Sequence, residues 1–463
     1  MPAFDSTQLA AWTGGRWTSM PATVTSGFGA DSRRIGRGQA FVALKTEKRD
    51  GHDFVIQAER SGASAAIVAR AVAGVSIAQL VVDDPLRALQ SIAREHRRTF
   101  TGTVIGVTGS AGKTSTKELL SAMLGGDEGG ALATSGNLNN HIGVALTLTR
   151  IDASRHAYAV VEAGISGPGE MGVLASMIEP DVALVTTVAP AHLEELGGLE
   201  GVAREKAVLP GALKDKSRAI FPSSCSSFEA FRALEREKAA VLEPTSRATA
   251  PGRVPFAVEH SAQGTRVTVT DRGTPAQVVL RRVSDGMAQN AALALVAALR
   301  LGIPLALIRE RLGAWTPAPL RGEWRSEPGR TLYLDCYNAN PASMADALAV
   351  FAEVVPAGGP RLFVIGCMEE LGADAERYHE ELGRSLRLGA ADQLVVVGAL
   401  AGAVRRGAML SGASGEQVTV SDSVAPLAES LAAFRGAVFV KGSRRHELEK
   451  AFKGAGVEEA AHA

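Results

Sequence analysis

The hydrophobic positions of the chain form short apolar runs that alternate with amphipathic stretches from about residue 103 onward. Strand-like runs and helix-like stretches alternate at residues 103–107, 117–124, 157–161, 171–178, 182–188 and 200–209. Continuous apolar runs of this length are typical of parallel strands that are buried on both faces. The pattern therefore predicts a parallel sheet with helices on both sides.

A second series of the same kind begins near residue 332. Its strand-like runs and helical stretches lie at residues 332–335, 343–354, 362–366, 378–389, 393–398 and 437–440. Residues 315–329 separate the two series, and Pro317, Pro319 and Pro328 predict a linker there rather than a strand or helix. Residues 221–283 are polar and β-rich, which we interpret as an insertion on the first sheet.

The first hundred residues form a smaller mixed unit, with strands expected at residues 40–44 and 64–69. A chain of 463 residues exceeds what one hydrophobic core usually supports. We therefore expect an α/β protein of three domains. These are a small mixed α/β N-terminal domain (1–100), a central P-loop-type parallel-sheet ATPase domain (101–315) and a C-terminal Rossmann-like α/β domain (316–463).

Composition narrows the class of protein. Apolar residues make up 46% of the chain and charged residues 21%, as in soluble globular proteins. No apolar run is long enough to cross a bilayer, and no export signal opens the sequence, so we expect a cytoplasmic protein without stable membrane insertion. The 49 basic residues balance 49 acidic ones without a basic stripe, which argues against a nucleic-acid partner. Three widely spaced cysteines fit a reducing compartment and exclude a cysteine-based metal cluster.

A glycine-containing loop, TGSAGKT at residues 108–114, joins a predicted strand to a predicted helix. Such a turn presents backbone N–H groups and a helix N-terminus to an anion. Lys113 would neutralise terminal phosphates, and the Thr114 hydroxyl would bind Mg²⁺. Val107 stands where the common phosphate loop has its first glycine, so this loop is a tighter form. The residues expected to bind ATP here are Thr108, Gly109, Ser110, Ala111, Gly112, Lys113, Thr114 and Ser115.

Glu162 and His192 follow two predicted parallel strands, at the edge of the sheet where ligands gather. A carboxylate and an imidazole near a triphosphate would suit a second divalent cation. The simpler interpretation of a lone acid at a strand end is a solvated loop residue. The phosphate loop nearby favours the metal site.

Lys206 falls on the apolar face of its predicted helix, in line with Leu199, Val202 and Leu209. Burying an ammonium group is costly unless it is paired or loses its proton. One interpretation is a lysine that extends its charge to the edge of the core. The other is a lysine that reacts with CO₂ to form a carbamate, an anion that could hold a metal. The pattern alone leaves both open.

These residues resemble those of the Mur ligases of bacterial cell-wall synthesis, over nearly the whole chain. The shared features are TGxxGKT, the strand-end glutamate, PAHLE at residues 190–194 and the lysine of an EGVAxxK helix. The resemblance implies that ATP phosphorylates the carboxylate of a UDP-linked muramyl precursor, and that an amine then displaces phosphate to form an amide. It implies two Mg²⁺ sites and a carbamylated Lys206 that assists Thr114, Glu162 and His192 in binding metal. The catalytic residues would be Lys113, Glu162, His192 and Lys206.

Within that family, residues 335–348, 367–372 and 440–444 look like the member that adds D-alanyl-D-alanine. Residues 31–54 resemble a uridine-nucleotide-binding segment, and residues 136–148 resemble a loop that contacts the muramyl precursor. The implied partners are UDP-N-acetylmuramoyl-tripeptide and D-alanyl-D-alanine, and we expect a monomer. The implied substrate-binding residues are Ser32, Arg33, Lys45, Asp50, His52, Asn137, Asn139, Asn140, His141, Asn338, Asn340, Lys441 and Ser443.

The nucleotide site is expected to extend beyond the loop. Asp335 ends a predicted buried strand, and the resemblance places it near the ribose and phosphates of ATP. Arg321, in the expected linker, could follow domain closure and reach the γ-phosphate. The adenine-contacting stretch of the family usually has histidine and asparagine where Gly286 and Met287 stand, so that only Asn290 is retained.

Three other functions remain possible on the sequence. A sister ligase adding one amino acid, such as diaminopimelate, would be expected to carry a DNPR-like motif that this sequence lacks. An ATP or GTP hydrolase that drives motion would need no sugar-nucleotide segment and no buried lysine. A non-catalytic UDP-sugar-binding module would not need Lys113, Glu162, His192 and Lys206.

Overall fold

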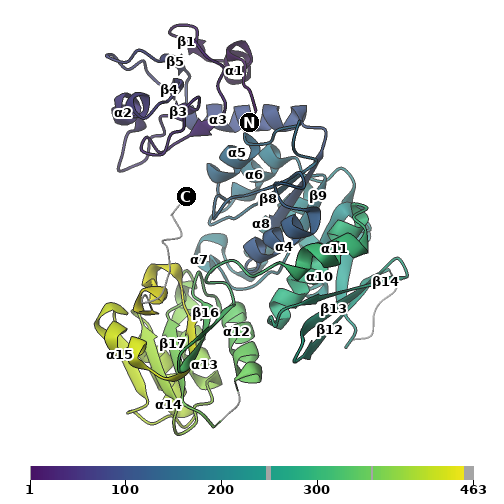
Figure 1. The fold of residues 1–463 in the computed structure, drawn as a ribbon, viewed down its shortest axis with the longest axis vertical. Coiled ribbons are helices and arrows are strands. Elements are labelled where there is room, and N and C mark those ends of the chain that lie inside the picture. The colour runs from purple at the N-terminus through teal and green to yellow at the C-terminus, as the bar shows by residue number, and fades with distance from the viewer. Residues whose placement is uncertain (1, 247–251, 356–357, 453–463) are drawn as a thin grey trace.

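The computed structural model describes residues 2–246, 252–355 and 358–452. Three β-sheets, each with its own helices, follow one another along the long axis of the molecule (Figure 1). The N-terminal sheet lies at one end, the nine-stranded sheet in the middle and the C-terminal sheet beside the middle one at the other end. This arrangement confirms the predicted three-part α/β architecture.

The N-terminal sheet has five short strands in the order β1-β5-β4-β3-β2. Neighbouring strands are parallel except for the β1–β5 pair. The two strands expected in this part of the chain are confirmed as β3 and β4. The elements are α1 (Ser6–Thr13), β1 (Arg16–Trp17), β2 (Phe28–Gly29), β3 (Ala40–Val42), α2 (Val55–Arg60), β4 (Ala65–Val68), β5 (Ala78–Val81) and α3 (Pro85–Thr99).

The central sheet has nine strands in the order β14-β13-β12-β11-β10-β9-β6-β8-β7. One face packs on α4, α10 and α11, and the other on α5, α6, α8 and α9. Cover on both faces explains the uninterrupted apolar runs of the parallel strands. The first elements are β6 (Thr103–Thr108), α4 (Lys113–Leu124), β7 (Ala131–Ala133), α5 (Gly143–Leu148), β8 (Tyr158–Glu162), α6 (Glu170–Ile178), β9 (Val182–Val185), α7 (Leu193–Leu196) and α8 (Leu199–Gly211).

The β-rich character predicted for residues 221–283 is confirmed, but its strands continue the central sheet rather than forming an insertion on it. Strands β10 and β11 extend the parallel part, and β12 to β14 add two antiparallel hairpin pairs at its edge. Alternate residues of β13 are buried, as expected for an antiparallel strand covered mainly on one face. The elements are β10 (Ala219–Pro222), α9 (Glu229–Arg236), β11 (Ala240–Pro244), β12 (Val254–Ser261), β13 (Gly264–Asp271), β14 (Thr274–Leu280), α10 (Asp285–Arg300) and α11 (Leu305–Gly313).

The C-terminal sheet has six strands in the order β15-β16-β20-β17-β18-β19, all parallel except β15. Strand β15 lies inside the proline-containing segment expected to be only a linker. Trp324 of β15 packs on the rings of Tyr333 and Phe351, which gives this strand a place on the core. The elements are β15 (Glu323–Glu327), β16 (Arg330–Asp335), α12 (Pro341–Val354), β17 (Arg361–Gly366), α13 (Ala375–Ser385), β18 (Gln393–Val397), α14 (Ala401–Leu410), β19 (Val418–Ser421), α15 (Ala428–Ala433) and β20 (Gly436–Lys441).

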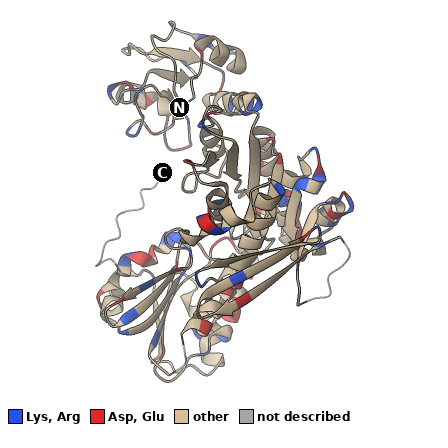
Figure 2. Cartoon of the chain, turned by 45° about the vertical axis from the view of Figure 1, so that its right-hand side comes forward, with Lys and Arg blue, Asp and Glu red and all other residues tan. Residues whose placement is uncertain are grey.

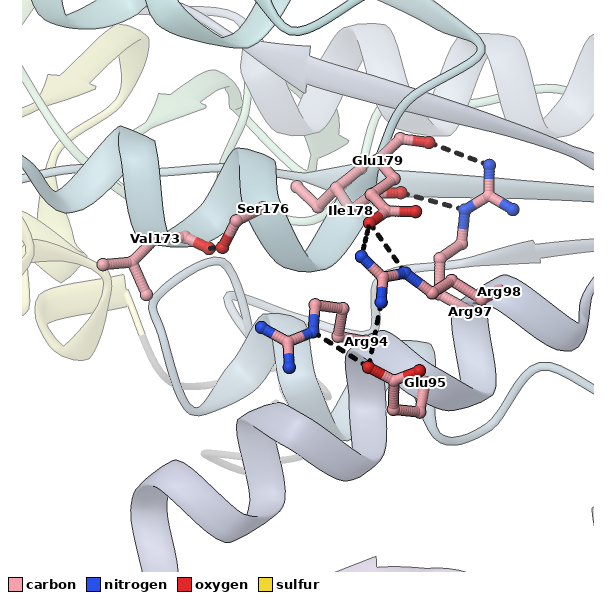
Figure 3. Close-up of polar contacts among 8 residues, drawn as sticks. All are labelled: Arg94, Glu95, Arg97, Arg98, Val173, Ser176, Ile178 and Glu179. Carbon is pink, nitrogen blue, oxygen red and sulfur yellow. Dashed lines mark hydrogen bonds and ion pairs between the residues drawn. The ribbon is translucent and has the colours of Figure 1, made fainter. Parts of the chain in front are cut away.

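Helix α3 joins the N-terminal unit to the central one. Its buried Arg97 donates hydrogen bonds to the carbonyl oxygens of Ile178 and Glu179, which follow at the end of α6 (Figure 3). The Arg97 guanidinium also binds the Asp181 carboxylate at 2.7 Å. The neighbouring Arg98 binds the exposed Glu179 side chain instead. One buried cation therefore ties α3 to the loop before β9.

Acidic and basic residues are interspersed along the ribbon in all three units (Figure 2). Among the residues that the structure describes, no helix is both long and apolar enough to span a bilayer.

Candidate active site

The phosphate loop occupies the turn from β6 to α4. Gly109 has φ +148° and Gly112 has φ +79°, which are backbone conformations that residues other than glycine rarely adopt. Space is also restricted, because a Cβ at Gly109 would lie 1.9 Å from the Thr186 hydroxyl oxygen and one at Gly112 would lie 2.4 Å from Asn290 Nδ2. The two glycines therefore let the backbone turn closely under the first turn of α4.

Lys113, the first residue of α4, lies over this turn. Its Nζ donates a hydrogen bond to the Gly109 carbonyl oxygen at 2.7 Å. Burial lowers the pKa of Lys113, the Glu162 carboxylate opposes that effect, and the Arg321 guanidinium adds to it. Lys113 and Arg321 line the same cleft. Two cationic side chains from different units thus face a common space suited to an anion.

Glu162 at the end of β8 is 1% exposed. Its carboxylate accepts hydrogen bonds from the Thr114 hydroxyl and from Asn139 Nδ2, both at 2.8 Å. The hydroxyl and carboxylate oxygens are hard ligands of the kind that Mg²⁺ takes, and Mg²⁺ commonly adds phosphate oxygens and waters rather than a full protein cage. This pair therefore fits Mg²⁺, although no cluster of three or more His, Cys, Asp or Glu side chains suited to a metal occurs within the described ranges.

Lys206 on α8 is 1% exposed, as its position on the apolar face predicts. Val202 and Leu209 share its buried row, whereas Leu199 at the start of the helix is 36% exposed. Burial, and then the charge of Lys113, hold the pKa of Lys206 well below its ordinary value. The ammonium makes no hydrogen bond or salt bridge with the described residues. The Lys206 side chain therefore does not reach solvent, and burial disfavours its charged form.

His192 lies at a contact between the central and C-terminal units. Its Nδ1 is 2.6 Å from Glu370 Oε2, and the next residue, Leu193, donates its backbone N–H to the Glu370 carbonyl oxygen at 3.3 Å. His192 and Glu370 both have positive φ, 53° and 61°. The hydrogen bond from His192 lowers the pKa of the Glu370 carboxyl. His192 is not among the residues that line the cleft.

The cleft lies between the central and C-terminal units and has a volume of about 330 Å³. Residues from the β6–α4 turn, the start of α10 and the carboxyl ends of β16 and β20 form its walls. Of the expected site residues, it brings together Ser110, Ala111, Gly112, Lys113, Thr114, Ser115, Asn139, Glu162, Asn290, Arg321, Asp335, Asn338, Asn340 and Lys441. It does not include Thr108, Gly109, His192, Lys206, Asn137, Asn140, His141 or Ser443.

Lys441 and Asp335 are direct neighbours in the C-terminal sheet and form a salt bridge of 2.6 Å. Lys441 is 1% exposed, and its Nζ also approaches the Asn338 carbonyl oxygen at 3.2 Å. Asn340 caps α12 by accepting the Ser343 N–H at 2.8 Å, with Pro341 as the first helical residue. The ion pair and the helix cap therefore lie together at the carboxyl edge of the C-terminal sheet.

The expected uridine-nucleotide residues belong to the N-terminal unit and lie outside the cleft lining. Buried His52 receives the Ala69 N–H on Nε2 and lies 2.6 Å from Asp50 through Nδ1, so it holds two loops together. Lys45 pairs with Asp50 in an isolated backbone bridge. Ser32 donates to Gln57, and exposed Arg33 pairs with Asp31.

Two residues in the expected motifs have contacts that their sequence did not reveal. Tyr337 lies under the Arg321 guanidinium at 3.9 Å, and Asp346 of α12 touches the start of α10. Both line the cleft. Asp346 occupies a polar position of a regular helix, so periodicity gave no signal for it.

Comparison with known proteins gives matches along most of the chain. Family models described as Mur ligase family, catalytic domain, as Mur ligase middle domain and as Mur ligase, glutamate ligase domain match residues 25–97, 107–298 and 320–444. The UDP-N-acetylmuramoyl-tripeptide–D-alanyl-D-alanine ligase of Escherichia coli is 33% identical over 369 residues, which cover 80% of either chain. The Bacillus subtilis ligase of the same name is 31% identical, covering 84% of this chain and 83% of its own.

Solved structures agree with these matches. MurF from Acinetobacter baumannii superposes with a TM-score of 0.84 at 30% identity, covering 97% of this chain and 98% of its own. MurF ligase from Thermotoga maritima, solved in complex with ADP, gives a TM-score of 0.77 at 27% identity, covering 92% and 96%.

Proposed function

Because this chain belongs to the Mur ligase family, we propose that it joins D-alanyl-D-alanine to UDP-N-acetylmuramoyl-tripeptide in peptidoglycan precursor synthesis. It is an ATP-dependent ligase that forms an amide bond. One observation carries the proposal: the phosphate loop with Lys113 and the C-terminal strand ends with Asp335 and Lys441 line a single cleft. A nucleotide and an incoming substrate could therefore meet there.

The chemistry follows from the poor reactivity of a carboxylate towards an amine. Transfer of the γ-phosphoryl group converts the carboxylate of the tripeptide into an acyl phosphate, and the dipeptide amine then displaces phosphate. Lys113 and Arg321 would neutralise the triphosphate as the anionic carboxylate approaches. Mg²⁺, held beside Thr114 and Glu162, would supply further charge neutralisation when bound. Residues 1–100 would hold the uridine diphosphate, residues 101–315 ATP and residues 316–463 the dipeptide.

We assign Arg321 to the γ-phosphate because its guanidinium lines the cleft with Lys113 and is near enough to lower the pKa of that lysine. Stacking on Tyr337 would hold it in place. Arg321→Ala should reduce kcat by at least tenfold with the fold unchanged in a thermal melt. Unchanged turnover would remove Arg321 from the site.

We further propose that Lys206 reacts with CO₂, forming an N–C bond and releasing one proton, to give a carbamate that helps His192 and Glu162 to bind a second metal ion. Its support is a buried amine that forms no salt bridge with the described residues. Lys206→Ala should lose activity and regain part of it with added short carboxylates. Carbon-13 NMR of the wild type in labelled bicarbonate should show a carbamate signal that the variant lacks. An unmodified Lys206 together with no rescue would contradict the assignment.

Phosphate release tests the whole proposal. Release from ATP should require both UDP-N-acetylmuramoyl-tripeptide and D-alanyl-D-alanine, and mass spectrometry should detect the pentapeptide product. Release without either substrate would indicate a nucleotide hydrolase. Product formed with a free amino acid such as diaminopimelate, and not with the dipeptide, would indicate a sister ligase. We also propose that the protein is a monomer, which a single peak at the mass of one chain in light scattering would support. A location in the reducing cytoplasm is likewise proposed, and the buried free cysteines fit it.

A further inference from the structure

The cleft continues past the phosphate loop along the first turn of α10. Asn290 lies against Gly112 of the loop, and Gly286 and Met287, one turn earlier on α10, line the same cleft. Helix α12 of the C-terminal unit packs beside α10 and supplies the opposite wall with Ser343 and Asp346 (Figure 1). A nucleotide with its phosphates on the loop would therefore place its base between these helices.

Asp346 presents a half-buried carboxyl group to this end of the cleft. Its Oδ1 accepts the Gly286 N–H at 2.9 Å, and the Ser284 hydroxyl donates to the same carboxyl. Ser284 caps α10 by accepting the Met287 N–H at 3.3 Å. Burial raises the pKa of Asp346, and the negative charges of Asp335 and Asp285 add to the effect.

No lysine, arginine or histidine within the described ranges forms a salt bridge with Asp346. A carboxyl group can accept about four hydrogen bonds, and the described residues supply two of them. Acceptor capacity therefore remains free on the wall of the cleft. Such capacity is costly to bury unless a ligand supplies the missing donor.

Gly286 and Asp346 form a matched pair. A Cβ at Gly286 would lie 2.6 Å from Asp346 Oδ2 and 3.0 Å from its carboxyl carbon. A larger side chain at position 286 would therefore push the carboxyl away from α10. The glycine, which departs from the usual family pattern, is what allows the acid to reach the cleft.

We infer that Asp346 is a specificity-determining residue that accepts a hydrogen bond from the exocyclic amino group of adenine. Adenine carries an N–H donor at the position where guanine carries a carbonyl oxygen. The guanine oxygen and the Asp346 oxygen are both acceptors, so no hydrogen bond could form between them. The inference rests on the proposed ATP site and adds the residue that selects the base.

Nucleotide binding without the ligase substrates tests this role. Calorimetry should compare ADP with purine riboside diphosphate, which lacks the amino group, and with GDP. The wild type should bind ADP about tenfold more tightly than the purine analogue, as one well-placed hydrogen bond provides. Asp346→Ala should bring that ratio close to one by weakening ADP alone. Glu353→Ala, an exposed acid on the same helix, should leave the ratio unchanged.

Asp346→Asn offers an amide N–H in place of one oxygen and should shift preference from ADP towards GDP, with its fold checked by a thermal melt. An ADP-to-purine ratio that stays near ten in Asp346→Ala would overturn the inference while leaving the ligase proposal intact. Tighter binding of GDP than ADP by the wild type would also overturn it, because a carboxylate can pair with guanine through N1–H and the 2-amino group. Failure to bind any of these nucleotides would refute the ATP site itself.

Discussion

Replacement of Arg97 by methionine should weaken the junction between the N-terminal and central units. Methionine keeps the length and the apolar stem of the side chain but has no donor. It would leave the carbonyl oxygens of Ile178 and Glu179 (Figure 3) without the donor that now lies 2.8–2.9 Å away. It would also leave the Asp181 carboxylate without its partner at 2.7 Å.

The magnitude follows from the burial of these groups. Removal of one partner from a buried, hydrogen-bonded ion pair commonly costs about 3–5 kcal/mol. The Arg97 side chain is 8% exposed, but the Asp181 side chain is 40% exposed, so water can replace part of the lost interaction. We therefore expect a loss at the lower end, about 3 kcal/mol.

Arg98 provides a matched control on the same helix. Its side chain is half exposed and pairs with the exposed Glu179 and with Glu95. Such surface pairs contribute about 0.2–1 kcal/mol, so Arg98→Met should change stability by no more than that.

Urea unfolding followed by tryptophan fluorescence measures the difference, because Trp12 and Trp17 pack against the core that α3 completes. Arg97→Met should lower the midpoint markedly at an unchanged slope, and Arg98→Met should not. Equal losses in the two variants would refute the reasoning, since they would show that the bonds made by Arg97 add nothing beyond an exposed charge.

Three further predictions concern the loop, the unit contact and the thiols. Gly109→Ala should lower the free energy of unfolding by about 2–5 kcal/mol and abolish ADP binding, because of its φ and because a Cβ there would collide with Thr186. Gly172→Ala on α6, where a Cβ meets open space, should be tolerated. Thermal melts and calorimetry would compare the two variants, and normal ADP binding by Gly109→Ala would contradict the predicted collision. Glu370→Ala should loosen the C-terminal unit in small-angle scattering, and Glu369→Ala, which loses contacts only within that unit, should not. Because the pKa of Glu370 is lowered in the folded chain, this contact should persist above the ordinary glutamate pKa and weaken as the pH falls below it; no expansion in acid would count against it. Burial raises the pKa of Cys225 and Cys336 to about 12 and that of Cys367 to about 11, so a thiol reagent at pH 8 should react only after unfolding, and rapid reaction of the native protein would show that these side chains are accessible.

Apolar periodicity predicted the parallel strands because residues such as Val161 and Leu184 are buried on opposite faces of a covered sheet. The same criterion missed β15, where no residue is fully buried and the pattern resembles a polar loop. It indicated β-structure in residues 221–283 but did not show that β12 to β14 continue the central sheet. The strand β15 depends on Trp324 meeting Phe351, a contact between distant parts of the chain.

Motif spacing predicted the position of the loop and Glu162 at strand ends that line the cleft, and helical periodicity predicted the buried position of Lys206. It could not identify the partner of His192 or the pair of Gly286 and Asp346. Those contacts arise where separate units pack together, and neither residue of a pair carries a local signal for the other.

Helix α3 determines which parts of the molecule unfold together. One apolar cluster runs without interruption from Leu9 and Leu89 in the N-terminal unit to Leu148 and Ile178 in the central one. The first two units should therefore melt as one cooperative block, while the C-terminal unit, with its own clusters, can unfold separately. Excising residues 1–100 would expose an aggregation-prone apolar surface on both fragments. A graft of that module from a relative would need a matching α5 and α6 surface to fold.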